Sequence, residues 1–358
     1  MASSPTPAGP TAPAEATPAV PQNNPEEVLH VDEEPEDDDA SSAFASSVAS
    51  SRTSLRSSLL DYRQENGRTY HRYKEGKYAL PNDEKENDRL DLQHQLWLLS
   101  LDDRLGVSPP CKEGAKVGRV LDVGTGTGIW ALNFADEHPE AEVIGNDLSA
   151  VVPGFVPPNV TFEVDDVEDE WLFSRPFDFI HSRVMTSSIN DWPLYLRRCY
   201  ENLTPGGYIE LQEVDLFLGS DDGTLKPDSA LSKFCDLLYE ASVKFGRPFM
   251  RIPSLTGLLE DAGFVDVTID RYKWPLNTWP KDPKYKELGI WEHENVMAGL
   301  EAFALAPLTR AHGWTQMEVQ VFLIEVRKEL RDRSIHAYSP AYCIIGRKPQ
   351  KEETPAPA

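Results

Sequence analysis

The sequence has 358 residues, of which 40% are hydrophobic, and a formal net charge of −24 at pH 7. This length can bury a substantial core, and one large domain with a tail is expected rather than two equal domains. Acidic residues concentrate between Glu26 and Asp39, yet the remainder is still acidic. Binding phosphate backbones requires clustered Lys and Arg, so the charge argues against a nucleic-acid substrate.

The composition also predicts the compartment. The four cysteines have no C-x-x-C spacing, so neither a disulfide framework nor a metal site is expected. The N-terminus lacks a basic and apolar signal segment, and no apolar run reaches about eighteen residues. Secretion and membrane binding are therefore not expected. The cytoplasm is the predicted location, with the nucleus as the alternative.

Residues 1–57 are rich in Pro, Ala, Ser and acids and poor in large apolar side chains, which predicts a disordered tail. Residues 58–117 follow as an expected helical N-terminal cap. A folded domain is predicted over 118–349, and 350–358 is expected to be a disordered C-terminus.

The segment Val120–Trp130 is an apolar strand that ends in three alternating glycines and leads into a helix. Gly124, Gly126 and Gly128 can adopt positive φ or admit a ligand against bare backbone, and the helix beginning near Ile129 presents unpaired N–H groups. The segment therefore predicts a nucleotide-binding turn. A dinucleotide fingerprint would place its third glycine at Ile129, which argues against an NAD-dependent oxidoreductase.

Acidic residues accompany the strands that follow. Asp122 lies inside the first strand, where a buried carboxylate requires a hydrogen-bond donor or a cation. The second strand, Glu142–Asp147, ends in an acid that can bind both hydroxyls of a ribose. The third, Val160–Val164, precedes Asp165 and Asp166.

The rest of the chain completes an alternating α/β pattern. A fourth strand is expected over 177–182 and a fifth after the Leu203–Gly207 turn, with later strands at 264–272 and 337–346. The last two should pair antiparallel. Between them, residues 277–334 contain helical runs and predict a helical insertion before the last strand. The pattern predicts a Rossmann-like sheet of seven strands with helices on both faces.

The ordered set of glycine turn, acids after strands two and three, and Leu-Thr-Pro-Gly-Gly turn resembles the class I S-adenosylmethionine-dependent methyltransferases. The resemblance implies that the three glycines lie under the methionine and ribose and that Asp122 lies near the ammonium group, directly or through water. The other implied contacts are those of Asp147 with the ribose hydroxyls, of Asp166 and the Val167 amide with the adenine edge, and of Ser182 and Arg183 with the methyl side.

Segments 65–71, 78–84 and 89–94 near the start, and 335–338 and 346–349 near the end, resemble fungal LaeA-like methyltransferases. That family contains pathway methyltransferases and a nuclear regulator of secondary metabolism. The resemblance therefore implies a methyltransferase that acts on a small molecule in fungal secondary metabolism, with a regulator that works through protein partners as the alternative. A closed aromatic pocket would favour the enzyme, and an exposed apolar groove beside the cofactor would favour the regulator.

No catalytic residue is assigned from the sequence. An acceptor that starts protonated needs a base, and the candidates are His71, His94, His181, Glu210 and Glu213. Tryptophans after strand four and around the insertion predict an aromatic acceptor if several face one cavity. These are Trp192, Trp274, Trp279, Trp291 and Trp314. The basic group Arg68, His71, Arg72, Lys74 and Lys77 is either a solvated helix face or a site near an anionic group such as the cofactor carboxylate.

Overall fold

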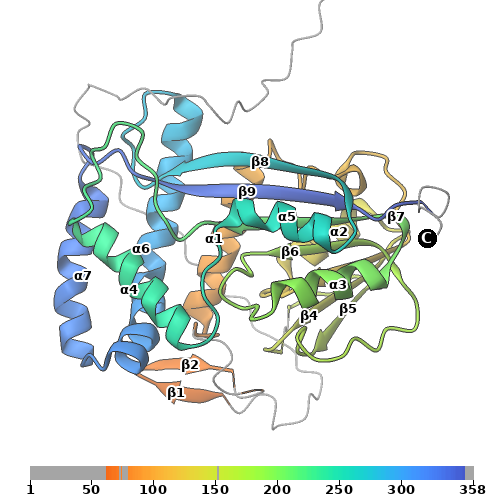
Figure 1. Cartoon of the computed structure of the whole chain (residues 1–358), viewed down its shortest axis with the longest axis horizontal. Coiled ribbons are helices and arrows are strands. Elements are labelled where there is room, and N and C mark those ends of the chain that lie inside the picture. Colours follow the sequence, from red (N-terminus) through yellow and green to blue (C-terminus); the bar gives the residue numbers. More distant parts are fainter. Residues whose placement is uncertain (1–61, 72–73, 75–79, 151–152, 351–358) are drawn as a thin grey trace, which may run out of the picture.

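The computed structural model describes residues 62–71, 74, 80–150 and 153–350 (Figure 1). The predicted tail over 1–57 lies outside these residues, as does 351–358. A seven-stranded sheet in the order β5-β4-β3-β6-β7-β9-β8 forms the centre of the fold. Its strands are β3 (Arg119–Val123), β4 (Glu142–Asp147), β5 (Val160–Val164), β6 (Phe177–Arg183), β7 (Leu203–Val214), β8 (Val265–Pro275) and β9 (Tyr338–Arg347).

Burial explains the position of each strand. Val120, Leu121 and Val123 of β3 are fully buried, as expected for a parallel strand covered on both faces. By contrast, β5 at the sheet edge alternates exposed side chains with buried or half-buried ones. β3, β4, β5, β6 and β7 are parallel, and β9 runs antiparallel between β7 and β8. The predicted seven-stranded α/β fold is confirmed.

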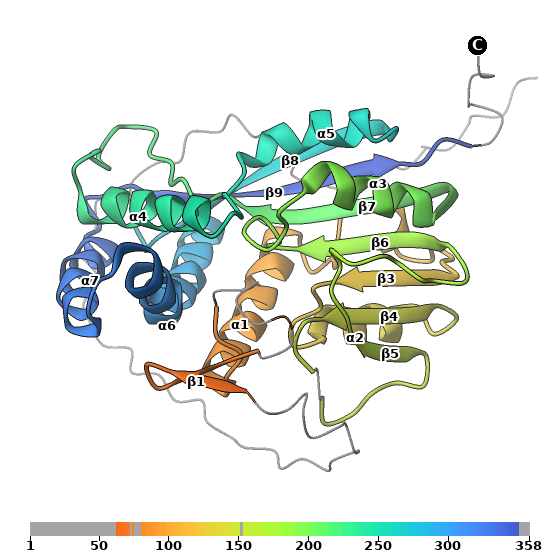
Figure 2. The ribbon, with the colours of Figure 1, turned by 60° about the horizontal axis from the view of Figure 1, so that its bottom comes forward.

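Helices cover both faces of this sheet (Figure 2). On one face, α3 (Trp192–Asn202) and α5 (Leu255–Asp261) pack against side chains that include Tyr342 and Ile344 of β9. The alternate positions Ala341 and Cys343 face α1 (Glu84–Ser100), and α2 (Ile129–Glu137) packs on β3, β4 and β6. Period-two alternation of the strands therefore separates two apolar cores.

The predicted helical insertion consists of α6 (Pro283–His312) and α7 (Gln316–Arg331). α7 begins with a capping box in which Thr315 and Glu318 satisfy each other's backbone N–H groups. Together with α4 (Ala230–Lys244), these helices form a separate apolar cluster beside the carboxyl edge of the parallel strands (Figure 2). α1 lies between this cluster and the sheet.

No helix in the described ranges is long and apolar enough to cross a membrane.

The segment expected to be a helical cap is only partly helical. It contains α1, a 3₁₀ turn (Pro109–Cys111) and an antiparallel hairpin of β1 (Arg63–Glu65) and β2 (Arg68–Tyr70) that the sequence analysis missed. Asn66 and Gly67 at its tip have positive φ. The strands are only three residues long, too short for period-two hydrophobicity to show.

The contact between α1 and β8 depends on Trp274, which is fully buried. Its ring packs edge-on against Trp97 with centroids 4.8 Å apart, and its Nε1 donates to Ser100 Oγ at 2.7 Å. A buried indole usually pairs its N–H in this way.

We predict that Trp274→Ala lowers the free energy of unfolding by about 3–5 kcal/mol, because it creates a cavity and leaves the α1–β8 contact unfilled. Urea unfolding followed by circular dichroism measures this loss. Met317→Ala, at a position 72% exposed, is the control and should change it by less than about 0.5 kcal/mol. Equal effects of the two changes would contradict the prediction.

Candidate active site

The glycine turn has the backbone conformation predicted for it. Gly124, Gly126 and Gly128 have φ values of 66°, 59° and 82°, a region that favours glycine. The Gly126 N–H donates to Asp147 Oδ2 at 3.0 Å, which links the turn to the end of β4. Thr127 Oγ1 donates to Asp91 Oδ1 of α1 at 2.6 Å. The turn is therefore held from two sides.

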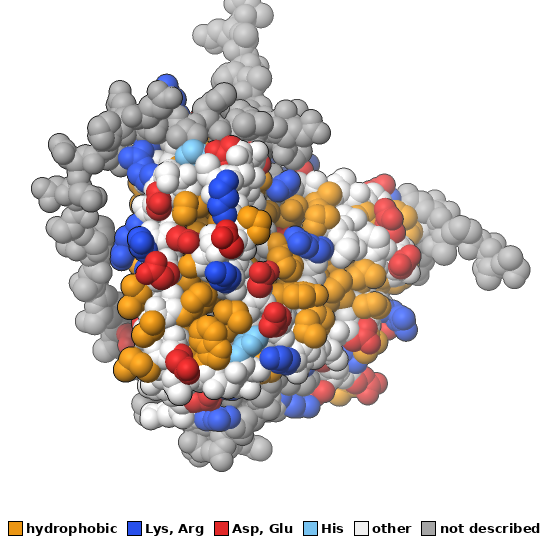
Figure 3. Space-filling view, turned by 60° about the vertical axis from the view of Figure 1, so that its left-hand side comes forward, with side chains coloured by type: hydrophobic (Ala, Val, Ile, Leu, Met, Phe, Trp, Pro, Cys, Tyr) orange, Lys and Arg blue, Asp and Glu red, His pale blue; other side chains and the backbone are white. Residues whose placement is uncertain are grey.

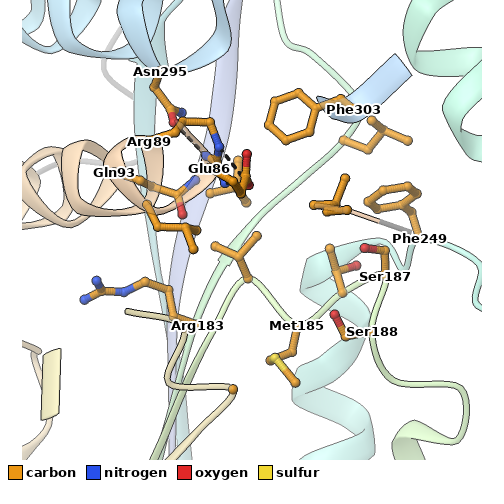
Figure 4. Close-up of a pocket in the computed structure, with 18 of the residues that line it drawn as sticks. Glu86, Arg89, Gln93, Arg183, Met185, Ser187, Ser188, Phe249, Asn295 and Phe303 are labelled. Carbon is orange, nitrogen blue, oxygen red and sulfur yellow. Dashed lines mark hydrogen bonds and ion pairs between the residues drawn. The ribbon is translucent and has the colours of Figure 1, made fainter. Parts of the chain in front are cut away.

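A cavity of about 380 Å³ begins at this turn and extends between α1, α4 and α6 (Figure 4). Most predicted cofactor residues line it: Asp122, Gly124, Gly126, Asp147, Asp166 and Val167. Gly128 does not line it but is the N-cap of α2.

Ser182 was expected on the methyl side, but the structure places it elsewhere. Its side chain is fully buried and does not line the cavity. Successive side chains of a strand point to opposite faces, and Arg183, one position further, does line the cavity. The Arg183 guanidinium nevertheless turns away from it, donating from Nε and Nη2 to Gln212 Oε1 at 2.9 and 2.7 Å.

Asp147 is placed to accept hydrogen bonds from a ligand. Its Oδ1 accepts the Ser149 N–H at 2.9 Å, and its Oδ2 accepts from Gly126. Burial, together with the nearby charge of Asp122, raises the pKa of Asp147 to about 6. The carboxylate is thus ionised at neutral pH but titrates well above the usual range of aspartate.

Asp122 is already bound by two side chains. Its Oδ2 accepts from Thr125 Oγ1 at 2.5 Å, and its Oδ1 accepts from His181 Nδ1 at 2.7 Å. The His181 ring stacks on Trp130 at 3.7 Å. Both carboxylate oxygens of Asp122 are therefore engaged, and the side chain orients Thr125 and His181 beneath the turn.

Asp166 follows β5 and lines the cavity. It is 3% exposed, and its Oδ1 accepts the Glu168 N–H at 3.0 Å. Lys74 lies 4.0 Å from Asp166 Oδ2 and forms a 2.7 Å ion pair with Asp169. Within the basic group predicted from the sequence, Arg68 forms an ion pair with Asp83. Arg72 and Lys77 lie outside the described residues.

Two of the five candidate bases have structural roles. Glu210 accepts the N–H groups of Val107 and Ser108. Glu213 accepts those of Met185 and Thr186 at 2.9 and 3.2 Å, and burial raises its pKa to about 8. Neither carboxylate lines the cavity; each holds a loop in place.

The histidines differ in position. Burial and the Arg183 charge lower the pKa of His94 to about 3, so its ring is neutral and bridges Asn133 and Arg183. His71 is buried, and neither it nor His94 lines the cavity. Among the candidate bases, only His181 does so.

The five tryptophans are absent from the cavity wall. The prediction of an aromatic acceptor required several of them to face one cavity, and this requirement is not met. Trp192, Trp274 and Trp279 are buried by packing, and Trp314 packs edge-on against Phe322. Aliphatic and phenylalanine side chains of α4, α6 and their neighbours form the wall instead, which the sequence analysis missed. They include Leu231, Phe234, Leu238, Phe249, Leu276, Val296, Leu300 and Phe303.

Metal chemistry was not expected from the sequence. In the part of the chain that the structure describes, no group of three or more His, Cys, Asp or Glu side chains is placed to hold a metal ion.

The strand order, the reversed β9 and a glycine turn facing acids at the ends of β4 and β5 together define a class I S-adenosylmethionine-dependent methyltransferase. Residues 92–269 match the family described as "Methyltransferase domain". The chain is 45% identical over 301 residues to the methyltransferase pytC of Aspergillus terreus, which covers 84% of this chain and 92% of pytC. The chain belongs to the fungal LaeA-like family of class I methyltransferases.

Other relatives carry different descriptions. The secondary metabolism regulator LAE1 of Cochliobolus heterostrophus is 40% identical, covering 80% of this chain and 95% of LAE1. The protein-methionine methyltransferase laeA of Emericella nidulans is 34% identical, covering 80% and 77%. Among solved structures, the chain is similar to Haemonchus contortus phosphoethanolamine N-methyltransferase 2 in complex with S-adenosyl-L-methionine, with a TM-score of 0.42, 20% identity and coverage of 74% and 53%.

We predict that Asp147→Ala weakens S-adenosylmethionine binding about 100-fold or more, because hydrogen bonds to a charged acceptor are lost and the Gly126 N–H is left unpaired. Titration calorimetry measures the affinity. Asp136→Ala on α2, remote from the cavity lining, is the control and should bind as the wild type does. An Asp147→Ala protein with wild-type affinity would refute the assignment.

The pKa of Asp147, about 6, predicts a pH dependence of binding. Only the ionised carboxylate accepts two hydroxyl hydrogen bonds, so a proton competes with the cofactor as the pH falls. We expect constant affinity above about pH 7 and a decrease approaching about tenfold per pH unit below pH 6. Calorimetry across this range tests it. Asp147→Asn should abolish this component of the pH dependence, and an identical profile in that variant would assign the titration to another group.

Proposed function

We propose that this methyltransferase transfers a methyl group to a small, largely apolar molecule of fungal secondary metabolism. One observation carries the proposal: the cavity that begins at the cofactor residues continues without interruption into an apolar lobe between α1, α4 and α6. A concave pocket lined mainly by apolar side chains is typical of a small-molecule site. The similarity to pytC supports this proposal.

We propose the cytoplasm as the location.

The cofactor end fits S-adenosylmethionine. Asp147 would accept hydrogen bonds from the ribose hydroxyls, and Asp166 with the Val167 N–H would bind the adenine edge. Gly124 and Gly126 line the cavity with bare backbone, against which the methionine portion would lie. The turn also passes close to Met185, since a Cβ at Gly124 would lie 2.5 Å from its Sδ. Each Asp122 oxygen already accepts one hydrogen bond from the protein, so contact with the cofactor ammonium would use the remaining lone pairs or run through water.

The residues around the cavity would contribute mainly by positioning. Bound S-adenosylmethionine supplies an electrophilic methyl group on a sulfonium. The chain must hold the acceptor in line with that methyl and exclude water, which is the main source of rate enhancement for an already activated leaving group. Glu213 holds the backbone of Met185 and Thr186 at the cavity wall, and an acceptor bound in the apolar lobe would displace water from it.

A second function is favoured by a different observation. The outer face of α7 carries Met317, Val321 and Ile324, which are 72%, 58% and 59% exposed and recur at helical spacing. Apolar side chains gather on the molecular face that comes forward when the α7 side is turned toward the viewer (Figure 3). With the similarity to LAE1, this supports a regulator that acts through protein partners.

One labelling experiment distinguishes the two functions. The full chain is incubated with methyl-labelled S-adenosylmethionine and a fungal extract separated into small-molecule and protein fractions. We expect label in the small-molecule fraction, and we expect Leu300→Trp, which fills the apolar lobe, to lower the rate at least about tenfold while cofactor binding is retained. Ile290→Trp, at an exposed position of α6, is the control.

Label confined to the protein fraction would favour a protein acceptor, as named for the laeA relative. Label in neither fraction, from a protein that binds the cofactor, would favour regulation without methyl transfer to the extract.

A further inference from the structure

One side of α1 carries polar side chains into the cavity. Glu86, Arg89 and Gln93 follow one another at intervals of three and four residues, so they share a helix face, and all three line the cavity (Figure 4). They are only 3%, 4% and 8% exposed. A polar row on a solvated helix would be exposed, so this row is shaped for contacts inside the protein.

Glu86 keeps one carboxylate oxygen open to the cavity. Arg89 donates to Glu86 Oε1 from Nε at 3.1 Å and from Nη2 at 2.7 Å. Arg89 Nη1 donates to Asn295 Oδ1 of α6 at 2.8 Å. Among the described residues Oε2 of Glu86 accepts no hydrogen bond. The ion pair therefore fixes the carboxylate and leaves Oε2 able to accept a hydrogen bond.

The Gln93 amide also lacks a partner. It forms no hydrogen bond within residues 62–71, 74, 80–150 and 153–350, although it is more than nine-tenths buried. The amide itself is not among the fully buried atoms, so it stays open to the cavity, where it can both donate and accept a hydrogen bond. Gln93 is seven residues from Glu86, two helical turns along the same face, and its side chain reaches into the cavity (Figure 4).

The arginines that line the cavity are already engaged. Every guanidinium nitrogen of Arg89 donates to Glu86 or Asn295, and those of Arg183 contact Gln212 and His94. Arg247 forms a 2.6 Å ion pair with Glu168. In the described part of the wall, Glu86 Oε2 and the Gln93 amide can therefore accept a hydrogen bond from a ligand, whereas each arginine already binds a protein group.

We propose that Glu86 and Gln93 bind the reacting group of the acceptor and restrict the substrates to apolar molecules whose nucleophilic oxygen or nitrogen carries a hydrogen. This inference rests on the proposed small-molecule function. Glu86 Oε2 accepts the O–H or N–H, and the Gln93 amide fixes its direction. A carboxylate would meet Glu86 without a compensating cation, and a thioether has no hydrogen to donate.

The transfer balances with this assignment. The lone pair of the acceptor atom forms the new bond to the methyl carbon while the carbon–sulfur bond breaks, and the bonding pair stays on sulfur as S-adenosylhomocysteine. For an alcohol, the hydrogen of the acceptor atom leaves as a proton to Glu86 Oε2 and then to solvent. An alkylamine is protonated at neutral pH, so it first gives one proton to Glu86 Oε2 and then to solvent, which frees the lone pair that attacks the methyl carbon. Arg89 keeps the carboxylate oriented throughout.

The test compares four probes that share a decyl chain: decan-1-ol, decylamine, methyl decyl sulfide and decanoate. Calorimetry measures their binding to the full chain loaded with S-adenosylhomocysteine at neutral pH. We expect the alcohol to bind at least about tenfold more tightly than the sulfide and the carboxylate, as expected for one hydrogen bond to a charged or buried group. The amine, which is an ammonium ion at neutral pH, should share this preference through a charge-assisted hydrogen bond to Glu86.

Two variants assign the preference to residues. Glu86→Gln should bind the amine and the carboxylate with similar affinity. Gln93→Leu should bind the alcohol and the sulfide with similar affinity. Glu84→Gln and Gln95→Leu, exposed positions on the same helix, are matched controls that should keep the wild-type order. Gln93→Leu leaves no protein group unpaired, so it remains informative if Glu86→Gln does not fold.

The outcomes are separable. If none of the probes binds, the small-molecule function fails and this inference fails with it. If the probes bind with equal affinities, or both variants keep the wild-type order, only the inference is overturned. If Glu86→Gln loses affinity for S-adenosylhomocysteine while its circular dichroism is unchanged, Glu86 and Gln93 bind the cofactor instead of the acceptor. That result would also overturn the inference.

Discussion

The packing of α1 against the glycine turn is the constraint on which both ends of the cavity depend. Asp91 holds the Thr127 hydroxyl at 2.6 Å, and His94 joins Asn133 of α2 to Arg183 at the end of β6. The same helix presents Glu86 and Gln93 on the opposite side of this contact. A displacement of α1 would therefore disturb both ends of the cavity together.

Burying the Glu86–Arg89 ion pair, and the hydrogen bond that joins Arg89 to α6, has an energetic cost. Arg89 and Asn295 are separated by 206 positions, and Gly299 leaves space for the arginine, since a Cβ there would lie 2.9 Å from Arg89 Cδ. Hydrophobic residues of similar size often stabilise a core as well as a buried pair does. The polar link is consistent with a role in ligand recognition, where fixed direction matters more than stability.

Much of the sheet was predictable because parallel strands have strong local signals. The strands Glu142–Asp147 and Val160–Val164 have the predicted bounds, and the positive φ values of the glycine turn follow from residue type. The sequence was a poorer guide to side chains whose position depends on strand parity or tertiary packing. Ser182 is one residue out of phase with the cavity, and nothing local indicates that Glu86 or Gln93 of a polar helix is buried.

The tryptophans also show that the sequence does not determine which side chains face the cavity. Their position along the chain suggested a stacking surface, but large rings fill core space wherever helices meet strands, as Trp274 does against Trp97. Which apolar side chains face a cavity is decided by how α4, α6 and α1 pack together. Composition alone does not contain that information.

The place of β9 in the sheet also affects how the chain can assemble. Within the described strands β8 is hydrogen-bonded to β9 alone, and β9 is separated from it in sequence by the whole of α6 and α7. On a ribosome, β8 would emerge long before its neighbour and would remain unpaired while both insertion helices were synthesised. The sheet closes only when β9 inserts between β7 and β8, so its completion is a late step of folding.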